Sequence, residues 1–302
     1  MNAFRDQADT LRALVRENNT APGRGPQVSE RWQHPLAVAV ASGKGGVGKT
    51  NIVANLCVAL SNRGARVLAV DGDLGLANLD IAFGVNARGS LVDLLAGEAT
   101  VDDVLTPGPN GIWMMPACSG RYDLANMTER ERYALLAAID SLEDRFDALV
   151  IDTGAGINSN AITFAGSAQH VIVVANIEPT SLADAYAFIK VMVQRCHTKR
   201  VQLVANMVKR PGEGEEIYAK LCEVTHRFLD VGIDYLGAIP RDAAIPRSIH
   251  ASVPLLLSTP SAPAARAIDH VAEKLLNLRG LERAGAGVQV FWKRLLAGGA
   301  TS

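Results

Sequence analysis

The sequence is poor in several features that mark other classes of protein. It has four cysteines, which are scattered and form no C-x-x-C pair, so neither a disulfide framework nor a structural zinc site is indicated. Aromatic residues make up only 5% of the chain, so no stacking platform for single-stranded nucleic acid is evident. The formal net charge is −1, which excludes a strong overall attraction to nucleic acid.

Targeting and membrane-spanning segments are also missing from the pattern. The N-terminus has no basic stretch followed by an apolar core, as a signal peptide has. No run approaches the roughly 18 apolar residues that a transmembrane helix needs. We therefore expect a cytosolic protein whose membrane contacts are peripheral. Its hydrophobic content of 48% over 302 residues is ample for a buried core.

Segments rich in glycine and proline divide the chain. Residues 1–17 carry apolar side chains at helical spacing, and residues 18–35 are polar with several prolines and glycines. A second flexible joint, Ala-Gly-Ala-Gly, begins at residue 284. The sequence thus predicts an N-terminal helix (1–17), a linker (18–35), a main domain (36–283) and a C-terminal linker and helix (284–302).

The main domain alternates strand-like and helix-like segments. The strand-like runs are Leu36–Ser42, Arg66–Asp71, Ile112–Pro116, Ala148–Asp152, His170–Asn176, Val201–Asn206 and Tyr235–Pro240. The helix-like runs are Ile52–Asn62, Thr128–Asp140, Ser181–Arg195, Glu215–Phe228 and Ala264–Leu278. This order predicts a doubly wound α/β fold, with a mostly parallel sheet and helices on both faces. Ligands of such sheets bind beyond the carboxyl ends of the strands.

One stretch has the spacing of a phosphate-binding loop. Between the first strand and the following helix lies a G-x-x-x-x-G-K-T pattern, whose glycines allow the backbone N–H groups to approach phosphates closely. We expect Lys49 to reach the β- and γ-phosphates and the Thr50 hydroxyl to bind Mg²⁺. The nucleotide-binding residues predicted here are Gly43, Lys44, Gly45, Gly46, Val47, Gly48, Lys49, Thr50 and Asn51.

Carboxylates end two of the predicted strands. Asp71 and Asp73 follow the second strand, and Asp152 ends a buried apolar strand in the manner of a Walker B motif. Beside a phosphate-binding loop, such carboxylates have Mg²⁺ and the attacking water as partners. In isolation, Asp-Gly-Asp is more typical of a turn with solvated acids.

The loop contains a second lysine, Lys44. The motif K-G-G-x-G-K-T resembles the deviant Walker A signature of the MinD/ParA/nitrogenase-iron-protein class of ATPases. The stretch from Asp71 to Asp80 is similar to switch I of that class. The resemblance implies a MinD-like P-loop fold, Mg-ATP hydrolysis and an ATP-sandwiched homodimer in which Lys44 contacts the partner's nucleotide. It further implies that Asp73 polarises the attacking water while Asp71 supports the metal shell. The catalytic set expected is Lys44, Lys49, Asp71, Asp73 and Asp152, and the metal-binding set is Thr50, Asp73 and Asp152.

The resemblance also suggests contacts to the γ-phosphate and to the base. Gly156 would donate its backbone N–H to the γ-phosphate, although Gly154 stands where related sequences often have proline. Asn206 and the run from Pro240 through Arg241 to Asp242 end two strands, where this class clasps adenine. Asn206 could equally be a strand-end turn residue.

The N-terminal segment narrows the subfamily. Its D-Q-A-x-x-L-R motif resembles that of the FlhG/FleN type of flagellar-number regulator and comprises Asp6, Gln7, Ala8, Leu11 and Arg12. The resemblance implies that this helix binds a signal-recognition-type flagellar GTPase, whose hydrolysis Gln7 stimulates. A flagellar transcription regulator or switch protein is a further partner of interest. An ordinary helix start is the alternative.

The C-terminal segment has the pattern of a membrane-surface helix. An apolar stripe and two flanking cations are formed by Val288, Phe291, Trp292, Lys293, Arg294, Leu295 and Leu296. Packing of this helix on its own domain is the alternative. Dimerisation on ATP would join two such helices and strengthen binding to the inner membrane.

We therefore expect a MinD-like ATPase that regulates flagellar number and placement as a membrane-associated homodimer. The same ATPase could position another cargo, such as a division, pilus or motility apparatus, or DNA. A nucleotide-gated binding module with negligible turnover is a further alternative. DNA is an unexpected partner, because the sequence shows no Lys/Arg cluster in the C-terminal part of the domain.

Overall fold

The computed structural model describes residues 36–74, 77–117, 128, 142, 145–278 and 294–295. The chain divides into two units, Met1–Gln33 and His34–Ser302, and the first lies outside the described residues. The predicted N-terminal helix, the linker, most of the C-terminal segment and, apart from Thr128, the helix predicted at Thr128–Asp140 lie outside them as well.

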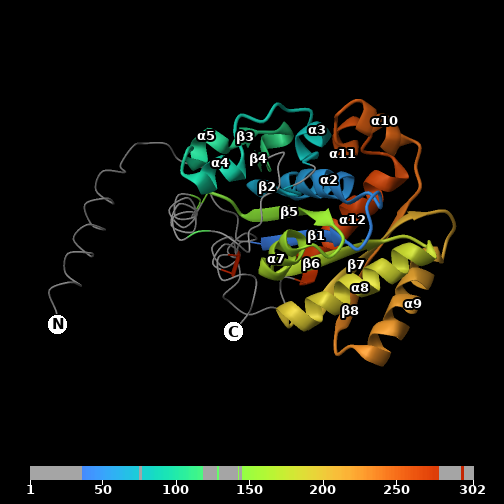
Figure 1. The fold of residues 1–302 in the computed structure, drawn as a ribbon. Helices are drawn as coiled ribbons and strands as arrows, with labels where there is room; N and C mark the ends of the chain where they lie inside the picture. The colour runs from blue at the N-terminus through green and yellow to red at the C-terminus, as the bar shows by residue number, and fades with distance from the viewer. Residues whose placement is uncertain are drawn as a thin grey trace, which may run out of the picture. The chain divides into compact units, whose positions relative to one another are not determined.

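An eight-stranded sheet forms the centre of the described domain (Figure 1). The strands are β1 (Leu36–Ser42), β2 (Val67–Gly72), β3 (Thr106–Pro107), β4 (Trp113–Met115), β5 (Ala148–Ala155), β6 (His170–Ala175), β7 (Arg200–Val208) and β8 (Gly232–Pro240). Their order is β3-β4-β2-β5-β1-β6-β7-β8, and all neighbours are parallel except β3 and β4.

Helices cover both faces of this sheet. They are α2 (Lys49–Ser61), α3 (Leu79–Phe83), α4 (Leu91–Ala96), α5 (Val101–Val104), α7 (Ser159–Ser167), α8 (Pro179–Cys196), α9 (Glu213–Phe228), α10 (Ala244–His250), α11 (Leu255–Ser258) and α12 (Pro263–Leu278), with a 3₁₀ turn, η2 (Pro109–Gly111). Helices α2 and α12 pack together on one face, and α7, α8 and α9 cover the other (Figure 1). The predicted doubly wound α/β fold is confirmed.

The central strands are buried on both faces because helices cover both. All residues of β1, β2 and β6 are buried, which explains their continuous apolar runs. β1 lies between β5 and β6, and the chain winds from it toward both edges. The carboxyl end of β1 is therefore the point where a doubly wound sheet binds its ligand.

Each of the seven predicted strands is present, and four of the five predicted helices appear within the described residues. The sequence pattern did not predict the short elements β3, α3, α4, α5, α10 and α11, nor α7. Helices α4 and α5 each begin with a capping box, Ser90 with Asp93 and Thr100 with Asp103. Local side-chain bonds thus start helices that are too short to show a hydrophobic period.

Candidate nucleotide-binding site

The glycine-rich loop joins β1 directly to α2. Gly46 and Gly48 have φ values of 78° and 92°, a region that favours glycine. A Cβ on Gly43 would collide with the backbone of Asp184 in α8, so glycine lets the loop lie against that helix. Within the described residues no side chain caps the N-terminus of α2, which leaves its first N–H groups for an anionic ligand.

Lys49, Thr50 and Asp152 meet at the floor of this loop. Lys49 is only 9% exposed, and its charge lies near the Asp152 carboxylate. The Thr50 hydroxyl lies near the same carboxylate and lowers its pKa. A buried ammonium beside a hydroxyl and a carboxylate matches what a magnesium-bound triphosphate needs for recognition.

Two carboxylates face each other across adjacent strands. Asp71 of β2 pairs in register with Asp152 of β5, and both are buried. Burial raises the pKa of Asp152, and repulsion from Asp71 raises it further. Burial also raises the pKa of Asp71. Asp152 Oδ1 has no hydrogen-bond partner among the described residues, so this buried oxygen fits a divalent cation.

Asp71 organises the segment that follows it. Its Oδ1 accepts from the backbone N–H of Asp73 at 3.0 Å, and its Oδ2 accepts from those of Asn78 and Leu79 at 3.0 and 3.1 Å. These bonds fix the backbone at Asp73 and at Asn78 and Leu79, where α3 begins. The Asp73 carboxyl carbon lies 3.5 Å from where a Cβ of Gly154 would be, so Asp73 approaches the end of β5.

The backbone N–H of Gly156 is engaged within the protein. Gly156 has a φ of 82°, and its N–H donates to the carbonyl oxygen of Ser42 at 2.9 Å. The contact to the γ-phosphate expected from the sequence therefore requires this segment to leave Ser42.

Lys44 turns onto α8 of its own chain. Its Nζ lies 3.0 Å from Glu178 Oε2 and 3.1 Å from Thr180 Oγ1. The Glu178 backbone N–H in turn donates to Asn176 Oδ1 at 3.0 Å. The Lys44 and Glu178 side chains are 38% and 57% exposed, so this ion pair is accessible to solvent.

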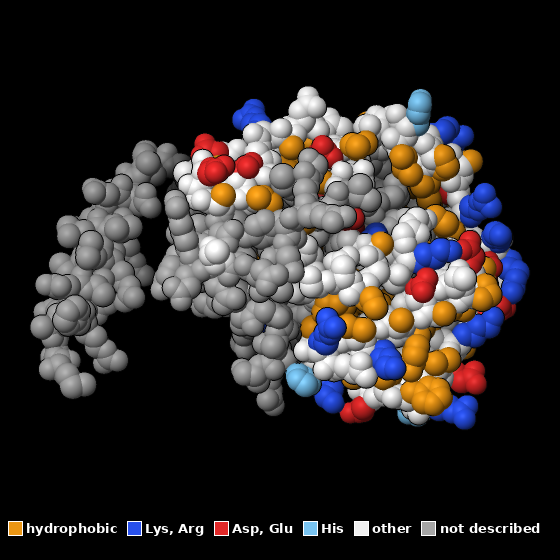
Figure 2. Space-filling view, viewed as in Figure 1, with side chains coloured by type: hydrophobic (Ala, Val, Ile, Leu, Met, Phe, Trp, Pro, Cys, Tyr) orange, Lys and Arg blue, Asp and Glu red, His pale blue; other side chains and the backbone are white. Residues whose placement is uncertain are grey.

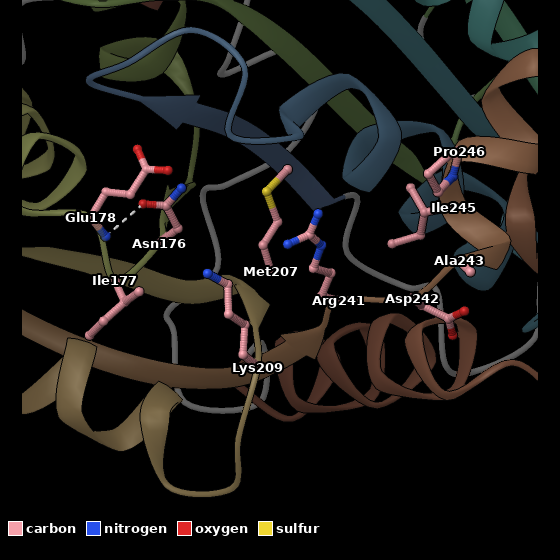
Figure 3. A pocket seen from close by; sticks show the side chains of 10 residues that line it. All are labelled: Asn176, Ile177, Glu178, Met207, Lys209, Arg241, Asp242, Ala243, Ile245 and Pro246. Carbon is pink, nitrogen blue, oxygen red and sulfur yellow. Dashed lines mark hydrogen bonds between the residues drawn. The ribbon is translucent and has the colours of Figure 1, made fainter.

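Two cavities open beside the loop. One, of about 440 Å³, is lined by apolar side chains that include Ile81 and Ile249, by Asn206, and by the loop and α2 residues Gly46, Gly48, Lys49, Thr50 and Asn51. The other, of about 630 Å³, lies next to it (Figure 3). Met207 and Ile245 line both, so the cavities meet at these residues. Their apolar walls suit a flat base.

The residues predicted to clasp adenine are divided between these spaces. Asn206 lines the loop cavity and donates from Nδ2 to the Val47 carbonyl at 2.7 Å. Arg241 and Asp242 line the neighbouring cavity, and Pro240 lines neither of the two. The Asp242 carboxylate points away from Arg241 and accepts from the N–H groups of Ala244 and Ala264 at 2.8 and 3.2 Å (Figure 3). Asp242 thus ties α10 to the start of α12.

The fold brings three basic side chains together in the C-terminal part of the domain. Lys209, Arg210 and Arg241 come from two separate segments and line one open hollow of about 540 Å³. Figure 2 shows Lys and Arg side chains gathered on the right of the molecule, with Asp and Glu among them. The sequence did not reveal the cluster because the ends of β7 and β8 bring the segments together.

Sequence reasoning also missed Glu178 and Thr180 as partners of Lys44, the apolar cavity residue Met207, and Asn55. Asn55 offered a signal, since it is a polar residue in the apolar run of α2.

Of the predicted terminal sites, only Arg294 and Leu295 are described. Leu295 is 1% exposed and belongs to the main hydrophobic core. Insertion of this side chain into a membrane would therefore require its release from the domain. The other predicted membrane residues and the D-Q-A-x-x-L-R motif lie outside the described residues. Among the helices that the structure describes, none is both long and apolar enough to cross a bilayer.

Comparison with known proteins identifies the family. Residues 38–255 match the CobQ/CobB/MinD/ParA nucleotide-binding domain. The chain is 40% identical over 243 residues to the antiactivator FleN of Pseudomonas aeruginosa, covering 80% of this chain and 87% of FleN. It is 34% identical over 263 residues to the flagellum site-determining protein YlxH of Helicobacter pylori, covering 86% and 89%.

A solved relative shows the ligand. The septum site-determining protein MinD of Pyrococcus horikoshii, complexed with Mg-ADP, superposes with a TM-score of 0.65 and 28% identity, covering 83% of this chain and all of that one. With the loop and the Asp152 site, these matches make the protein an ATP hydrolase that uses Mg²⁺. The chain belongs to the CobQ/CobB/MinD/ParA nucleotide-binding family, as a MinD/ParA-type ATPase of the FlhG/FleN subfamily.

Proposed function

We propose that this ATPase forms a homodimer around Mg-ATP, associates with the membrane and regulates flagellar number and placement by stimulating a signal-recognition-type GTPase. The observation that carries the flagellar assignment is its similarity, over 86% of the chain, to a protein named as flagellum site-determining, together with the match to the antiactivator FleN over 80% of the chain. The N-terminal motif Asp6 to Arg12 supports the same assignment.

The position of Lys44 supports the dimer. The loop carries Lys44 away from the Asp152 site and onto Glu178 and Thr180. An exposed ion pair of this kind contributes only about 0.2–1 kcal/mol, so the lysine can exchange its partners for the phosphate oxygens of a second molecule. In the proposed dimer, Lys44 of each chain contacts the nucleotide of the other.

The remaining site residues would act by positioning and charge. Lys49 and the N–H groups of the loop bind the phosphates, while Thr50, Asp73 and Asp152 hold the metal ion. Mg²⁺, when bound, neutralises charge on the phosphate oxygens. Asp73 orients the attacking water, and Asp71 supports it by fixing the segment from Asp73 to Leu79.

Sedimentation velocity tests the dimer. Asp73→Ala, which should slow hydrolysis, is expected to dimerise with saturating Mg-ATP. Adding Lys44→Ala should leave it monomeric while nucleotide still binds. Lys209→Ala, an exposed lysine beside the neighbouring cavity, is the matched control and should dimerise normally. A monomer under every condition, lipid vesicles included, would contradict the proposal.

The proposed stimulation of the flagellar GTPase is tested separately. A peptide of residues 1–17 should raise the GTP turnover of the flagellar GTPase, and Gln7→Ala should abolish this effect, because a glutamine amide can orient the attacking water. Equal stimulation by the Gln7→Ala peptide would exclude the activator role and leave the ATPase assignment intact.

A second candidate follows from the basic hollow. Lys209, Arg210 and Arg241 favour a polyanion such as DNA as the positioned cargo. The Arg210 guanidinium is already paired with Glu216 at 2.6 Å, which weakens this candidate. A gel shift with duplex DNA that falls steeply as salt rises, and that Lys209→Ala weakens, would favour it.

A further inference from the structure

Asn55 is a fully buried polar residue one turn beyond the phosphate-binding loop. Its exposed fraction is 0%, although it lies in the apolar run of α2. Its Oδ1 accepts a hydrogen bond from the backbone N–H of Leu256 in α11 at 2.8 Å. Its Nδ2 donates to the Asn51 carbonyl oxygen at 2.8 Å and to Asn51 Oδ1 at 3.3 Å.

The backbone fixes the orientation of both amide side chains. The N–H of Leu256 can only donate and the carbonyl of Asn51 can only accept, so the Asn55 oxygen and nitrogen cannot be interchanged. Because Asn55 then presents an N–H to the Asn51 side chain, the nearer atom of Asn51 must be its oxygen. The Asn51 amino group is thereby turned away from Asn55.

Asn51 lines the cavity beside the loop, together with Lys49 and Thr50. The phosphate oxygens of a magnesium-bound nucleotide only accept hydrogen bonds, so an amide contributes to phosphate binding only through its N–H groups. We propose that Asn55 is a positioning residue for nucleotide binding: by holding Asn51 Oδ1, it directs Asn51 Nδ2 as a donor toward a phosphate oxygen of the bound nucleotide. This inference concerns the ATPase site and does not depend on dimerisation.

Asn55 also stabilises the fold, and the test must separate this contribution from its effect on nucleotide binding. The Leu256 N–H belongs to the first turn of α11, whose N-cap residue, Pro254, makes no side-chain bond to it. The Asn55 oxygen satisfies this buried donor. Asn55→Asp keeps an acceptor for Leu256 and replaces only the amino group. The Asn51 amide should then turn over and present its oxygen to the nucleotide.

The experiment measures binding of Mg-ADP by isothermal titration calorimetry, with ATP turnover in parallel. Asn55→Asp should weaken Mg-ADP binding at least tenfold and raise KM similarly, with kcat within twofold of wild type, since the lost contact is made in ground and transition states alike. Asn110→Asp is the control: it also removes an amide donor and adds a charge, on an exposed turn, and should bind normally.

A double-mutant cycle shows whether the effect passes through Asn51. Asn55→Asp should cause less than a twofold further loss when Asn51 is already alanine. A tenfold loss in that background, or normal binding by Asn55→Asp alone, would overturn the proposal. If Asn55→Asp does not fold, Asn51→Asp provides the test, because it keeps an oxygen for Asn55 but removes the donor. It should weaken Mg-ADP binding at least tenfold. Normal affinity would overturn the inference.

Discussion

Asp152 lies in the carboxyl-terminal part of β5, and Asp242 lies just beyond the end of β8. The two carboxylates differ in burial and in their hydrogen-bond partners. Asp152 is buried, its Oδ1 has no partner among the described residues, and burial raises its pKa. Asp242 follows β8, both of its oxygens accept backbone N–H groups, and these bonds lower its pKa. Of these two carboxylates, only Asp152 keeps an oxygen that could bind a ligand, because backbone N–H groups occupy both oxygens of Asp242.

The largest effect is expected for Asp152→Asn. Loss of a charged oxygen beside Thr50 should lower kcat for Mg-ATP by at least about a hundredfold. Without magnesium and nucleotide, stability should hold or rise at neutral pH, because a group with a raised folded-state pKa destabilises the fold when ionised. Turnover and thermal denaturation of the apo protein measure both. Normal turnover, or a large loss of stability, would mean that Asp152 stabilises the fold, as Asp242 does, and does not act in the nucleotide site.

Asp71 combines the burial of Asp152 with the backbone hydrogen bonds of Asp242, so it tests which of the two determines the effect of a substitution. It is buried beside Asp152, but its oxygens bind the N–H groups of Asp73, Asn78 and Leu79. Asp71→Asn turns an amino group toward at least one of these donors, and an unsatisfied buried donor costs about 1–3 kcal/mol. Because burial raises the folded-state pKa of Asp71 as well, loss of its charge offsets part of this cost at neutral pH, so we expect apo stability to fall by less than that amount and kcat to fall about tenfold. Chemical denaturation should therefore show Asp71→Asn to be less stable than Asp152→Asn.

Asp242→Ala should affect stability and leave turnover intact. It removes the acceptor for Ala244 and Ala264 at the starts of α10 and α12, and loss of such a cap costs about 0.5–2 kcal/mol. Since its folded-state pKa is lowered, the stabilisation is present above about pH 4 and is lost as the pH falls further. If the base contact expected from the sequence is made, KM for ATP rises instead, so KM decides between the two roles.

The contrast between Asp152 and Asp242 also shows which features of the site could be predicted from the sequence. Motif spacing predicted that Lys49, Thr50 and Asp152 lie close together, because the loop and the strand ends are local features that a parallel sheet brings to one edge. The sequence could not show that Asp242 is occupied by two N–H groups, one of them 22 residues away. Nor could it show the Asn55 bond to Leu256, which spans 201 residues. These hydrogen-bond partners depend on how the helices pack in three dimensions. Short helices such as α10 and α11 also show too little hydrophobic periodicity to be predicted from the sequence.

The smallest stability effect is expected for Glu178, the exposed carboxylate that pairs with Lys44. Glu178→Gln removes a solvent-accessible ion pair, so unfolding should change by less than about 1 kcal/mol. It should nevertheless release Lys44, and in an Asp73→Ala background we expect the Mg-ATP dimer to form at a severalfold lower protein concentration. Sedimentation at graded concentrations measures this shift, with Glu216→Gln, which breaks the exposed pair to Arg210, as the matched control. Weaker dimerisation would instead mean that Glu178 itself contributes to the dimer, and that its contact with Lys44 does not restrain the lysine.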